Sequence, residues 1–554
     1  MLEGKTAAII PVRGGSRGIP RKNARLLAGK PLLAYSVEAA LSARRVEAVY
    51  VSTDDAELAE IARRCGAEVL ERKERLALDE VTLDEVILEA VRQIEDSGSA
   101  VGQVVTIQAT CPLITAHTID AVCDKQIEEE LDSVLTVVDD THLGWRRGDD
   151  GNMIPGYQER VNRQFLPRHY RETGGVIVCS RGTIESGSRI GKRVGVVEVS
   201  KTEAIDIDDY FDWWMAEKSL FRKCIYFHVI GNGSVGLGHV YRALTLADRL
   251  IDHDLCFVVN EQSGLAAQLI ERRFYPVKVV PEGEEAHTII EDEPHLVIND
   301  VLDTEESFML TLKQAGLAVI NFEDLGPGSL GADYLINAMY DSHPVRKDNK
   351  VLGGVEYCCL RDEFYSIQPG AIKKQVKNVL LLFGGTDPNG TTIKCLRWLD
   401  EIRGDWKITV ILGIGHEHPD EVREYAAEAQ HEIEIVCDTT IISRYMADAD
   451  VAITSAGRTV FELGSLGVPT VVTAQNEREM HHVFAQSSPG VIFCGQANQL
   501  EKKKFVDMLE QIINSDLMRE KMREALLGSG LREGIQNVLD TIEAVLRHCK
   551  RRVK

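Results

Sequence analysis

The chain of 554 residues lacks several features that would place it in other classes of protein. No segment reaches the roughly 20 apolar residues that a membrane-spanning helix needs. The opening, MLEGKTAAIIPV, holds too short an apolar run for a signal peptide. The sequence contains no low-complexity tract, so its composition does not indicate disorder. We therefore expect a folded, cytoplasmic protein.

Positive charge is also scarce. The chain has 63 Lys and Arg against 86 Asp and Glu, a formal net charge of −23. Nucleic acids and anionic membranes bind clustered positive charge, so we expect neither as a partner. The 12 cysteines include no CxxC pair, the usual spacing of structural zinc ligands, and buried free thiols are the expectation.

What the chain does have is the alternating pattern of an α/β protein. Apolar runs such as 6–12, 48–52 and 104–108 alternate with stretches of helical period, as in a parallel sheet covered by helices. The helical pattern YFDWWMAEKSLFRK then ends, and a new strand with a glycine-rich turn follows. The first domain is therefore predicted to span 1–221.

The remainder is predicted to form two Rossmann-like lobes. One βα series starts at Ile225 and another at Val379. The polar, lysine-bearing stretch 368–377 between them is typical of a linker. The predicted lobes are 222–372 and 373–554.

A glycine-rich, basic loop follows the first predicted strand. It reads RGGSRGIPRKN over residues 13–23. Its glycines let the backbone approach a ligand, and its basic side chains suit a triphosphate. It lacks the Walker spacing GxxxxGK[ST]. From the spacing alone, the alternative is a solvated basic loop.

Two aspartates in the sequence AIDID, Asp206 and Asp208, indicate a metal site. On a strand, residues two apart face the same side, so both carboxylates would project together as oxygen ligands for Mg²⁺. The alternative is a strand end followed by a helix that Asp209 caps.

The motifs of this first part resemble the acylneuraminate cytidylyltransferase family. The family's opening motif reads like PARxGSKGIPxKN, and residues 11–23 read PVRGGSRGIPRKN. Further motifs follow in family order: GKPLLAYSVEAA, VYVSTDD, IQATCPL, ETGGVIV and AIDIDDYFD. The resemblance implies a Rossmann-like nucleotidyltransferase (GT-A-like) domain that transfers CMP from CTP to a nonulosonic acid, a sialic-acid-like sugar. Similar enzymes pair as dimers. A rival in the same fold, an enzyme that activates Kdo, usually lacks the GIPxKN continuation that is intact here.

The resemblance also implies site residues. Lys22 would neutralise charge at the α-phosphate, and Asp206 and Asp208 would hold Mg²⁺. Gln108 and Arg171 would contact the sugar acid, although a surface ion pair is the alternative for the arginine. The implied nucleotide-binding positions are Arg13, Ser16, Asn23, Arg72 and Asp79.

The second part has a glycine-rich turn of its own, GNGSVGLGHVYR. His239 stands there at the predicted start of a helix, whose dipole disfavours a charged imidazole. His239 is therefore a candidate general base, with a structural histidine as the alternative.

This second part resembles the nucleotide-sugar hydrolase of pseudaminic acid synthesis, which is itself similar to the two-lobed GT-B glycosyltransferases. The matching motifs are GLGHVYR, GVEYCCLRDEF, GGTDPN and TSAGRTVFELGSLGVPTV. The resemblance implies that His239 activates water against a UDP-sugar. Gly457 and Thr459 would bind its diphosphate and Glu462 its ribose, with a solvated helix residue as the alternative for Glu462.

Together the resemblances imply a bifunctional enzyme of nonulosonic acid biosynthesis. Its second part would hydrolyse a UDP-diacetamido-trideoxy sugar. The alternatives are that this part is a glycosyltransferase, or a non-catalytic module that binds nucleotide sugars.

Overall fold

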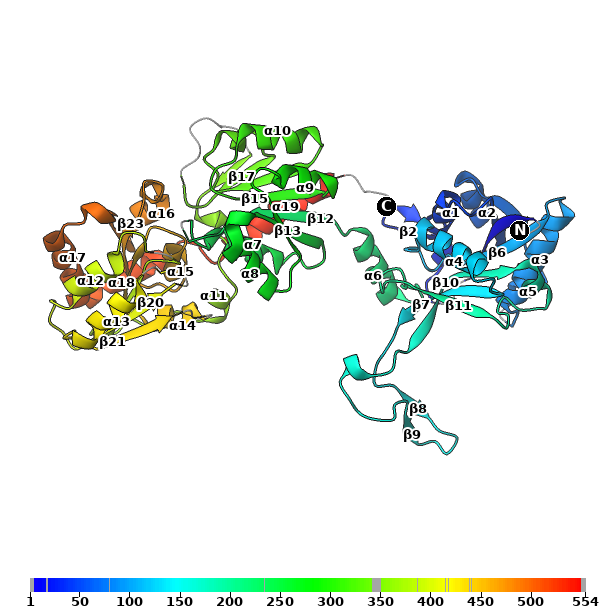
Figure 1. The fold of residues 1–554 in the computed structure, drawn as a ribbon, viewed down its shortest axis with the longest axis horizontal. Coiled ribbons are helices and arrows are strands. Elements are labelled where there is room, and N and C mark those ends of the chain that lie inside the picture. Colours follow the sequence, from blue (N-terminus) through cyan, green and yellow to red (C-terminus); the bar gives the residue numbers. More distant parts are fainter. Residues whose placement is uncertain are drawn as a thin grey trace. The chain divides into compact units, whose positions relative to one another are not determined.

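The computed structural model describes residues 4–15, 18–78, 80–233, 235–340, 350–385, 387–413, 415–416, 418–437, 439 and 441–549. The chain forms two compact units that divide between Arg222 and Lys223, beside the predicted domain boundary (Figure 1). Within the described residues, no helix is both long and apolar enough to cross a membrane.

The first unit is built on a seven-stranded sheet with the order β11-β7-β10-β6-β1-β4-β5. All neighbouring strands are parallel except those that pair with β10. The strands are β1 (Lys5–Pro11), β4 (Ala48–Thr53), β5 (Glu68–Glu71), β6 (Val101–Ile107), β7 (Ser133–Asp139), β10 (Tyr170–Ser180) and β11 (Val194–Glu198). The central strands β1 and β6 are almost wholly buried, because helices cover both faces of the sheet.

The helices of this unit are α1 (Leu32–Ser42), α2 (Ala56–Arg64), α3 (Leu83–Asp96), α4 (Ala116–Glu128), α5 (Arg181–Glu185) and α6 (Tyr210–Leu220). Their N-termini follow local rules. Asp55 caps α2, and Asp209 forms a capping box with Asp212 at the start of α6. Two short ribbons complete the unit: β2 (Leu26–Leu27) with β3 (Lys30–Pro31), and β8 (Trp145–Arg147) with β9 (Met153–Pro155).

The second unit contains two parallel sheets. The first lobe has the order β14-β13-β12-β15-β16-β17-β18, and the second has β21-β20-β19-β22-β23-β24. Counted from the first strand of each lobe, the second sheet shows the 3-2-1-4-5-6 order of doubly wound folds, and the first sheet shows the same order with a seventh strand added at its edge. Such sheets bind ligands where the strand order reverses, which is here between β12 and β15 and between β19 and β22.

The strands of the first lobe are β12 (Cys224–Val229), β13 (Asp254–Asn260), β14 (Val277–Val280), β15 (Leu296–Asp300), β16 (Ala318–Phe322), β17 (Tyr334–Asn337) and β18 (Val351–Gly353). Those of the second are β19 (Asn378–Leu382), β20 (Lys407–Leu412), β21 (Ile433–Cys437), β22 (Val451–Ser455), β23 (Thr470–Ala474) and β24 (Val491–Gln496). The helices between them are α7 (Gly238–Ala247), α8 (Gly264–Arg272), α9 (Glu285–Glu291), α10 (Glu306–Gln314), α11 (Glu363–Ser366), α12 (Thr391–Leu399), α13 (Pro419–Glu428), α14 (Ile442–Asp448), α15 (Thr459–Ser465) and α16 (Val483–Ser487).

Three C-terminal helices follow, α17 (Lys502–Asn514), α18 (Asp516–Leu527) and α19 (Gly534–His548). The predicted second lobe of 373–554 is wrong at its end, because α19 returns to the first lobe (Figure 1). Its apolar stripe, which includes Ile535, Val538 and Ile542, is buried against the core of that lobe. An amphipathic helix can cover either sheet, so its sequence does not reveal which one it joins.

Candidate functional site

The glycine-rich loop of the first unit leads from β1 to a buried lysine. Lys22 is 8% exposed, and its Nζ donates to the carbonyl oxygen of Ile207. The same nitrogen lies 3.4 Å from Oδ1 of Asp208. The structure therefore brings together Lys22 and Asp208, which are far apart in sequence.

Two glycines of this loop stand where a larger residue would not fit. A Cβ on Gly18 would lie 2.1 Å from the carbonyl oxygen of Asp208. A Cβ on Gly14 would lie 2.6 Å from Oδ2 of Asp55, and the Gly14 amide donates to Oδ1 of Asp54 at 3.2 Å. The loop is thus pressed between the acidic segment and the STDD turn that follows β4.

The acidic segment itself differs from the prediction. Residues 204–208 form no strand, so the strand geometry used to align Asp206 with Asp208 is wrong. The segment is held instead by Ile207, which is fully buried and donates its amide to the carbonyl of Thr110 at 2.8 Å. Asp209 caps α6, as the alternative proposed, while Asp208 faces Lys22.

The two aspartates differ in environment. Asp208 has a side chain that is 81% exposed. Oδ1 of Asp206 is buried and has no hydrogen-bond partner in the part of the chain that the structure describes. Burial raises the pKa of Asp206, and the neighbouring charge of Asp208 raises it further. A cation at this point would satisfy the buried oxygen.

Mg²⁺ suits this pair of carboxylates. Across the described ranges, no three His, Cys, Asp or Glu side chains gather to hold a metal ion. Mg²⁺ does not need such a cage, because it keeps several waters and binds through one or two carboxylates plus substrate phosphates. Asp206 and Asp208 are the residues that would hold it.

Two arginines, Arg13 and Arg72, lie beside Asp54. Arg72 is 7% exposed and donates from Nη2 to the carbonyl of Ser52 at 2.8 Å. Burial lowers the pKa of Arg72 to about 10; Asp54 opposes this shift and Arg13 adds to it. Arg13, Asp54 and Arg72 are therefore close neighbours.

The other predicted nucleotide positions are less fully defined. Oδ1 of Asn23 is buried and unpartnered among the described residues, as an atom kept for a ligand would be. Ser16 and Asp79 lie outside the described residues.

Of the predicted sugar-binding residues, Gln108 lies just after β6 and Arg171 lies on β10. Gln108 follows β6, and a Cβ on Gly174, whose φ is +71°, would lie 2.9 Å from its Nε2. The amide of Gln108 thus rests against the ETGG motif. Arg171 is half exposed, with Nε 3.9 Å from Oδ2 of Asp140, a geometry that matches the surface ion pair named as its alternative.

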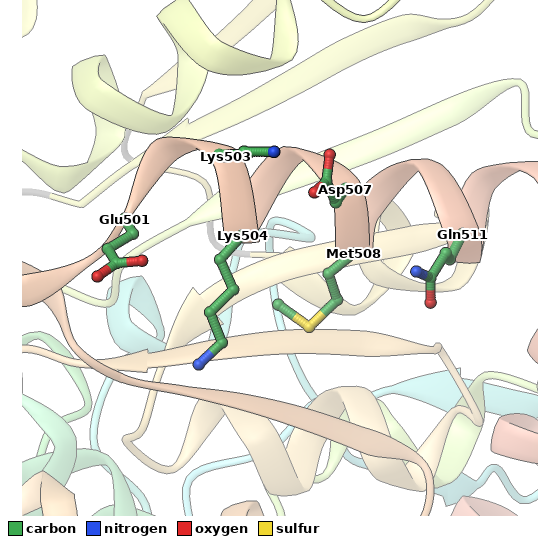
Figure 2. A pocket seen from close by; sticks show the side chains of 6 residues that line it. All are labelled: Glu501, Lys503, Lys504, Asp507, Met508 and Gln511. Carbon is green, nitrogen blue, oxygen red and sulfur yellow. The ribbon is translucent and has the colours of Figure 1, made fainter.

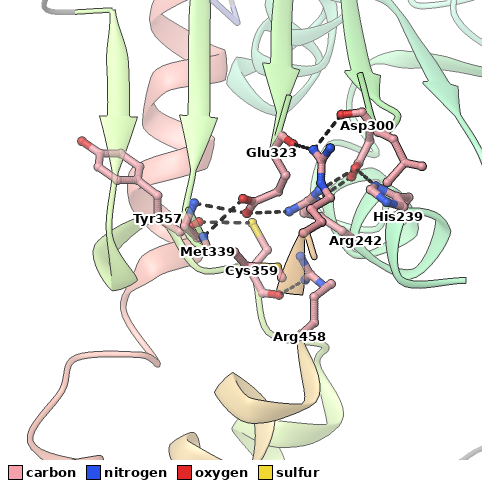
Figure 3. Close-up of polar contacts among 11 residues, drawn as sticks. His239, Arg242, Asp300, Glu323, Met339, Tyr357, Cys359 and Arg458 are labelled. Atoms are coloured by element: carbon pink, nitrogen blue, oxygen red, sulfur yellow. Dashed lines mark hydrogen bonds and ion pairs between the residues drawn. The ribbon is translucent and has the colours of Figure 1, made fainter. Parts of the chain in front are cut away.

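In the second unit, His239 lies in the first turn of α7, at the point where the strand order of the first lobe reverses. Its Nδ1 is 2.7 Å from Oδ1 of Asp300, the last residue of β15 (Figure 3). Arg242 donates to both oxygens of Asp300, at 2.6 and 2.5 Å, and to Oε1 of Glu323 at 2.9 Å. These four side chains form the dyad network.

The dyad network is charged and buried. The side chains of Arg242 and Glu323 are each 3% exposed, and that of Asp300 is fully buried. Burial alone would raise the pKa of Asp300, but the charge and hydrogen bonds of Arg242, with those of His239, lower it well below its usual range. An ionised Asp300 accepts the Nδ1 proton of His239, which leaves Nε2 able to accept another.

The predicted nucleotide positions of the second lobe lie after β22, where its strand order reverses. Gly457 precedes α15, and Thr459 is the first residue of that seven-residue helix. Glu462 is not the solvated helix residue that the alternative named. Its side chain is 12% exposed and accepts from Nε of Arg361 at 2.8 Å.

Sequence reasoning missed the residues that hold His239. Arg242 belongs to the motif GLGHVYR, where no role was assigned to it. Asp300 is the last residue of β15, and Glu323 directly follows β16. A usable signal was present, because an acidic residue directly after an apolar strand lies at the edge where open parallel sheets bind ligands.

One surface hollow of about 440 Å³ lies away from these positions (Figure 2). Its lining comes from one segment along α17: Glu501, Lys503, Lys504, Asp507, Met508 and Gln511. None of the predicted site residues lines it, and a single helix face does not enclose a ligand.

The first unit has the fold of a nucleotidyltransferase domain, and the second unit is a two-lobed, GT-B-like module. Residues 7–146 match the family described as Cytidylyltransferase, and residues 379–538 match the glycosyltransferase family 28 C-terminal domain. The CMP-N,N'-diacetyllegionaminic acid synthase of Legionella pneumophila is 30% identical over 220 residues, which are 38% of this chain and 94% of that protein. The chain therefore belongs to the cytidylyltransferase family.

Two other comparisons cover more of the chain. The uncharacterized protein MJ1062 of Methanocaldococcus jannaschii is 32% identical over 300 residues, 50% of this chain and 61% of that protein. The crystal structure of MurG from Acinetobacter baumannii is 13% identical, with a TM-score of 0.45, over 58% of this chain and 99% of that one. The chain spans about half to three fifths of the length of the first curated relatives it matches.

Proposed function

We propose that the first unit transfers CMP from CTP to the anomeric hydroxyl of a nonulosonic acid. The observation that carries this proposal is the buried Oδ1 of Asp206, which has no hydrogen-bond partner among the described residues and lies beside Asp208 and Lys22, at the mouth of a glycine-rich loop. The arrangement suits a metal-bound triphosphate. The Legionella relative, whose name describes a CMP-sugar acid synthase, supports the same class of product.

In the proposed reaction, the sugar oxygen attacks the α-phosphorus of CTP, a new P–O bond forms, and pyrophosphate leaves with the electrons of the broken bond. Lys22 would neutralise charge at the α-phosphate, and Arg13 and Arg72 would hold the other phosphates. Bound Mg²⁺ would supply further neutralisation from its position on Asp206 and Asp208. No covalent intermediate with the protein is needed.

The test is pyrophosphate release from CTP and Mg²⁺ with a panel of sialic, legionaminic, pseudaminic and Kdo acids. Asp208→Asn should lower kcat about 100-fold or more, the usual effect of removing one electrostatic contact to a transition state. Asp209→Asn is the matched control, since asparagine also caps helices, and it should stay within about twofold of wild type. Full activity of Asp208→Asn would refute the metal assignment.

The panel also separates the possible sugars. The intact GIPxKN loop favours sialic or legionaminic acid, whereas the resemblance of the second unit favours pseudaminic acid. A preference for Kdo, or no release with any acid, would contradict the proposed acceptor.

The first unit is also proposed to pair with a second copy of the chain. Its β8–β9 ribbon lies at the end of an arm that projects from the sheet (Figure 1). Large apolar side chains on this arm are exposed: Trp145, Met153, Ile154 and Phe165. A second arm or sheet would bury them. Trp145→Ser with Phe165→Ser should therefore yield a monomer by light scattering, and a monomeric wild type would contradict the pairing.

For the second unit we propose that the His239–Asp300 dyad accepts a proton from water. The water oxygen attacks the anomeric carbon of a UDP-sugar, and UDP leaves with the electrons of the broken C–O bond. The 2.7 Å contact with the buried, ionised Asp300 supports the tautomer that carries its proton on Nδ1, which leaves Nε2 available to accept one. The second candidate is a glycosyltransferase, which the family 28 match favours.

UDP release separates these candidates. Release from a UDP-diacetamido-trideoxyhexose without an acceptor supports the hydrolase, and release only with a sugar acceptor supports the glycosyltransferase. No release in either case would leave a binding module. His239→Ala should abolish the release, whereas His287→Ala, at an exposed position of α9, should not.

A further inference from the structure

One loop of the second lobe makes contacts in two directions. The loop 475–483 follows β23, and its neighbouring residues Arg478 and Glu479 face different parts of the unit. Arg478 contacts the first lobe, whereas Glu479 lies against the turn at Gly457. This loop is here called the bridging loop.

Arg478 holds two loops of the first lobe. Its Nη1 donates to Oδ1 of Asp303 at 2.8 Å, and its Nη2 donates to the carbonyl of Leu302 at 2.8 Å and to that of Glu323. Its guanidinium also lies 5.1 Å from the ring centre of Tyr340. The side chain is only 20% exposed, and its planar guanidinium donates to all of these acceptors.

The two loops that Arg478 contacts adjoin Asp300 and Glu323, the two acidic members of the dyad network. Asp300 lies two residues before Leu302, and Glu323 contributes both a carbonyl to Arg478 and a carboxylate to Arg242. Displacement of these loops would move both carboxylates that position His239 and Arg242.

These loops are also tied to each other. Oδ2 of Asp324 accepts from Thr304 Oγ1 and from Asn321 Nδ2, each at 2.6 Å, and Oδ1 of Asp324 accepts from the Thr304 amide at 3.1 Å. All three residues are buried. The loops after β15 and β16 are therefore cross-linked, so a contact at Asp303 acts on the pair.

A second connection joins the bridging loop to the same network. The carboxylate of Glu323 accepts from the amides of Ala338 and Met339 at 3.1 and 3.2 Å (Figure 3). The carbonyl of Met339 in turn accepts from the amide of Val483 at 2.9 Å. The bridging loop is thus connected to the network that supports His239 at two positions, Arg478 and Val483.

In the other direction, the bridging loop supports the predicted diphosphate turn. Oε2 of Glu479 accepts from the Gln475 amide at 2.8 Å, and a Cβ on Gly457 would lie 3.9 Å from its Oε1. The ring of His482 packs against Phe461 of α15, with 4.9 Å between ring centres. An anion at the turn would therefore contact groups that the bridging loop holds.

We propose that Arg478 is a positioning residue through which the bridging loop couples a nucleotide at the Gly457 turn to the loops that hold the His239 dyad. This inference rests on the proposed nucleotide site of the second unit. Nucleotide binding at the Gly457 turn would then change how well ordered the loops after β15 and β16 are. The contacts of the bridging loop connect the two places without a gap.

The experiment is hydrogen exchange of the full chain with and without UDP. In wild type, UDP should slow amide exchange both in 456–462 and in 301–304 with 323–326, in each case by about fivefold or more, the lower end of typical coupling. Arg478→Ala should keep the slowing in 456–462 and lose it in the first-lobe loops. Arg478→Lys keeps the charge without the planar fork and should also lose it.

Arg423→Ala is the matched control, because Arg423 on α13 pairs with the exposed Asp420. It should behave as wild type. Equal slowing of the first-lobe loops in wild type and both Arg478 variants would overturn the coupling alone. If UDP leaves 456–462 unchanged in wild type, the proposed nucleotide site fails and the coupling fails with it.

Discussion

Replacement of Arg242 by methionine is the most direct test of the second unit's architecture. The side chain of Arg242 is 3% exposed, and its guanidinium makes three hydrogen bonds to the carboxylates of Asp300 and Glu323. Arg242→Met keeps much of the side-chain volume but leaves two buried carboxylates without their cation. Removal of one partner from a buried ion pair typically costs about 3–5 kcal/mol, and we expect a loss of this size.

The assay must report on the second unit alone, because a chain of two units does not unfold in one step. Hydrogen exchange of the β15 peptide at increasing urea concentrations gives a free energy of opening for that sheet. A loss of less than about 1 kcal/mol in this free energy of opening would refute the prediction that the buried carboxylates need the charge of Arg242.

A second variant separates charge from packing. Arg242→Met with Asp300→Leu removes one of the stranded carboxylates, while Glu323 keeps its two backbone donors. Because apolar replacement of buried ion pairs is often neutral, the double variant should recover at least half of the loss. Its UDP release should still be abolished, since His239 has lost its orienting carboxylate. A double variant less stable than Arg242→Met would contradict the electrostatic explanation.

Further outcomes follow from the close contacts and from one buried acid. Gly18→Ala should lower pyrophosphate release about 10-fold or more, because overpacking by a methyl group costs roughly 1–3 kcal/mol. Gly15→Ala should cost far less, because no atom of the described residues beyond its two chain neighbours lies within 4 Å of the new Cβ, and equal losses would contradict this reasoning. Gly174→Ala should raise KM for the sugar acid more than KM for CTP, since the new Cβ meets Gln108, and an unchanged KM for the acid would exclude that contact. Burial raises the pKa of Glu479 from 4.5 to about 7. The folded unit therefore holds a proton that the unfolded chain releases, and the free energy of unfolding should fall as pH rises from 4.5 to about 7, by on the order of 3 kcal/mol. Glu479→Gln should flatten this slope in urea titrations of the second unit, and an unchanged slope would exclude Glu479 as its source.

Much of the fold could be predicted from local patterns in the sequence. Short apolar runs predicted the α/β class, since strands buried on both faces must be apolar throughout, and glycine-rich turns marked where each βα series restarts. The glycine loop of residues 13–23 could be predicted as a ligand site because its glycines and basic residues are contiguous. The capping role of Asp209 could also be read locally, because a cap depends on only the next three residues.

The segment 204–208 shows the limit of such patterns. Its alternation of apolar and acidic residues suits a strand, yet no neighbouring strand pairs with it. Its conformation depends on contacts with Thr110 and Lys22, which lie far away in sequence. The pairing of Glu462 with Arg361 and the return of α19 to the first lobe have the same origin.

The sequence by itself determined that the first part resembles cytidylyltransferases and that the second part resembles GT-B proteins. It also determined where the glycine loops lie and that His239 stands at the start of a helix. Only the tertiary structure decided that Asp300, Arg242 and Glu323 surround that histidine and that Arg478 reaches the loops after β15 and β16 from the other lobe. The reason is physical. A motif records residues that share one turn, whereas the carboxyl ends of parallel strands gather side chains from separate βα units, and no spacing along the chain encodes which of them will meet.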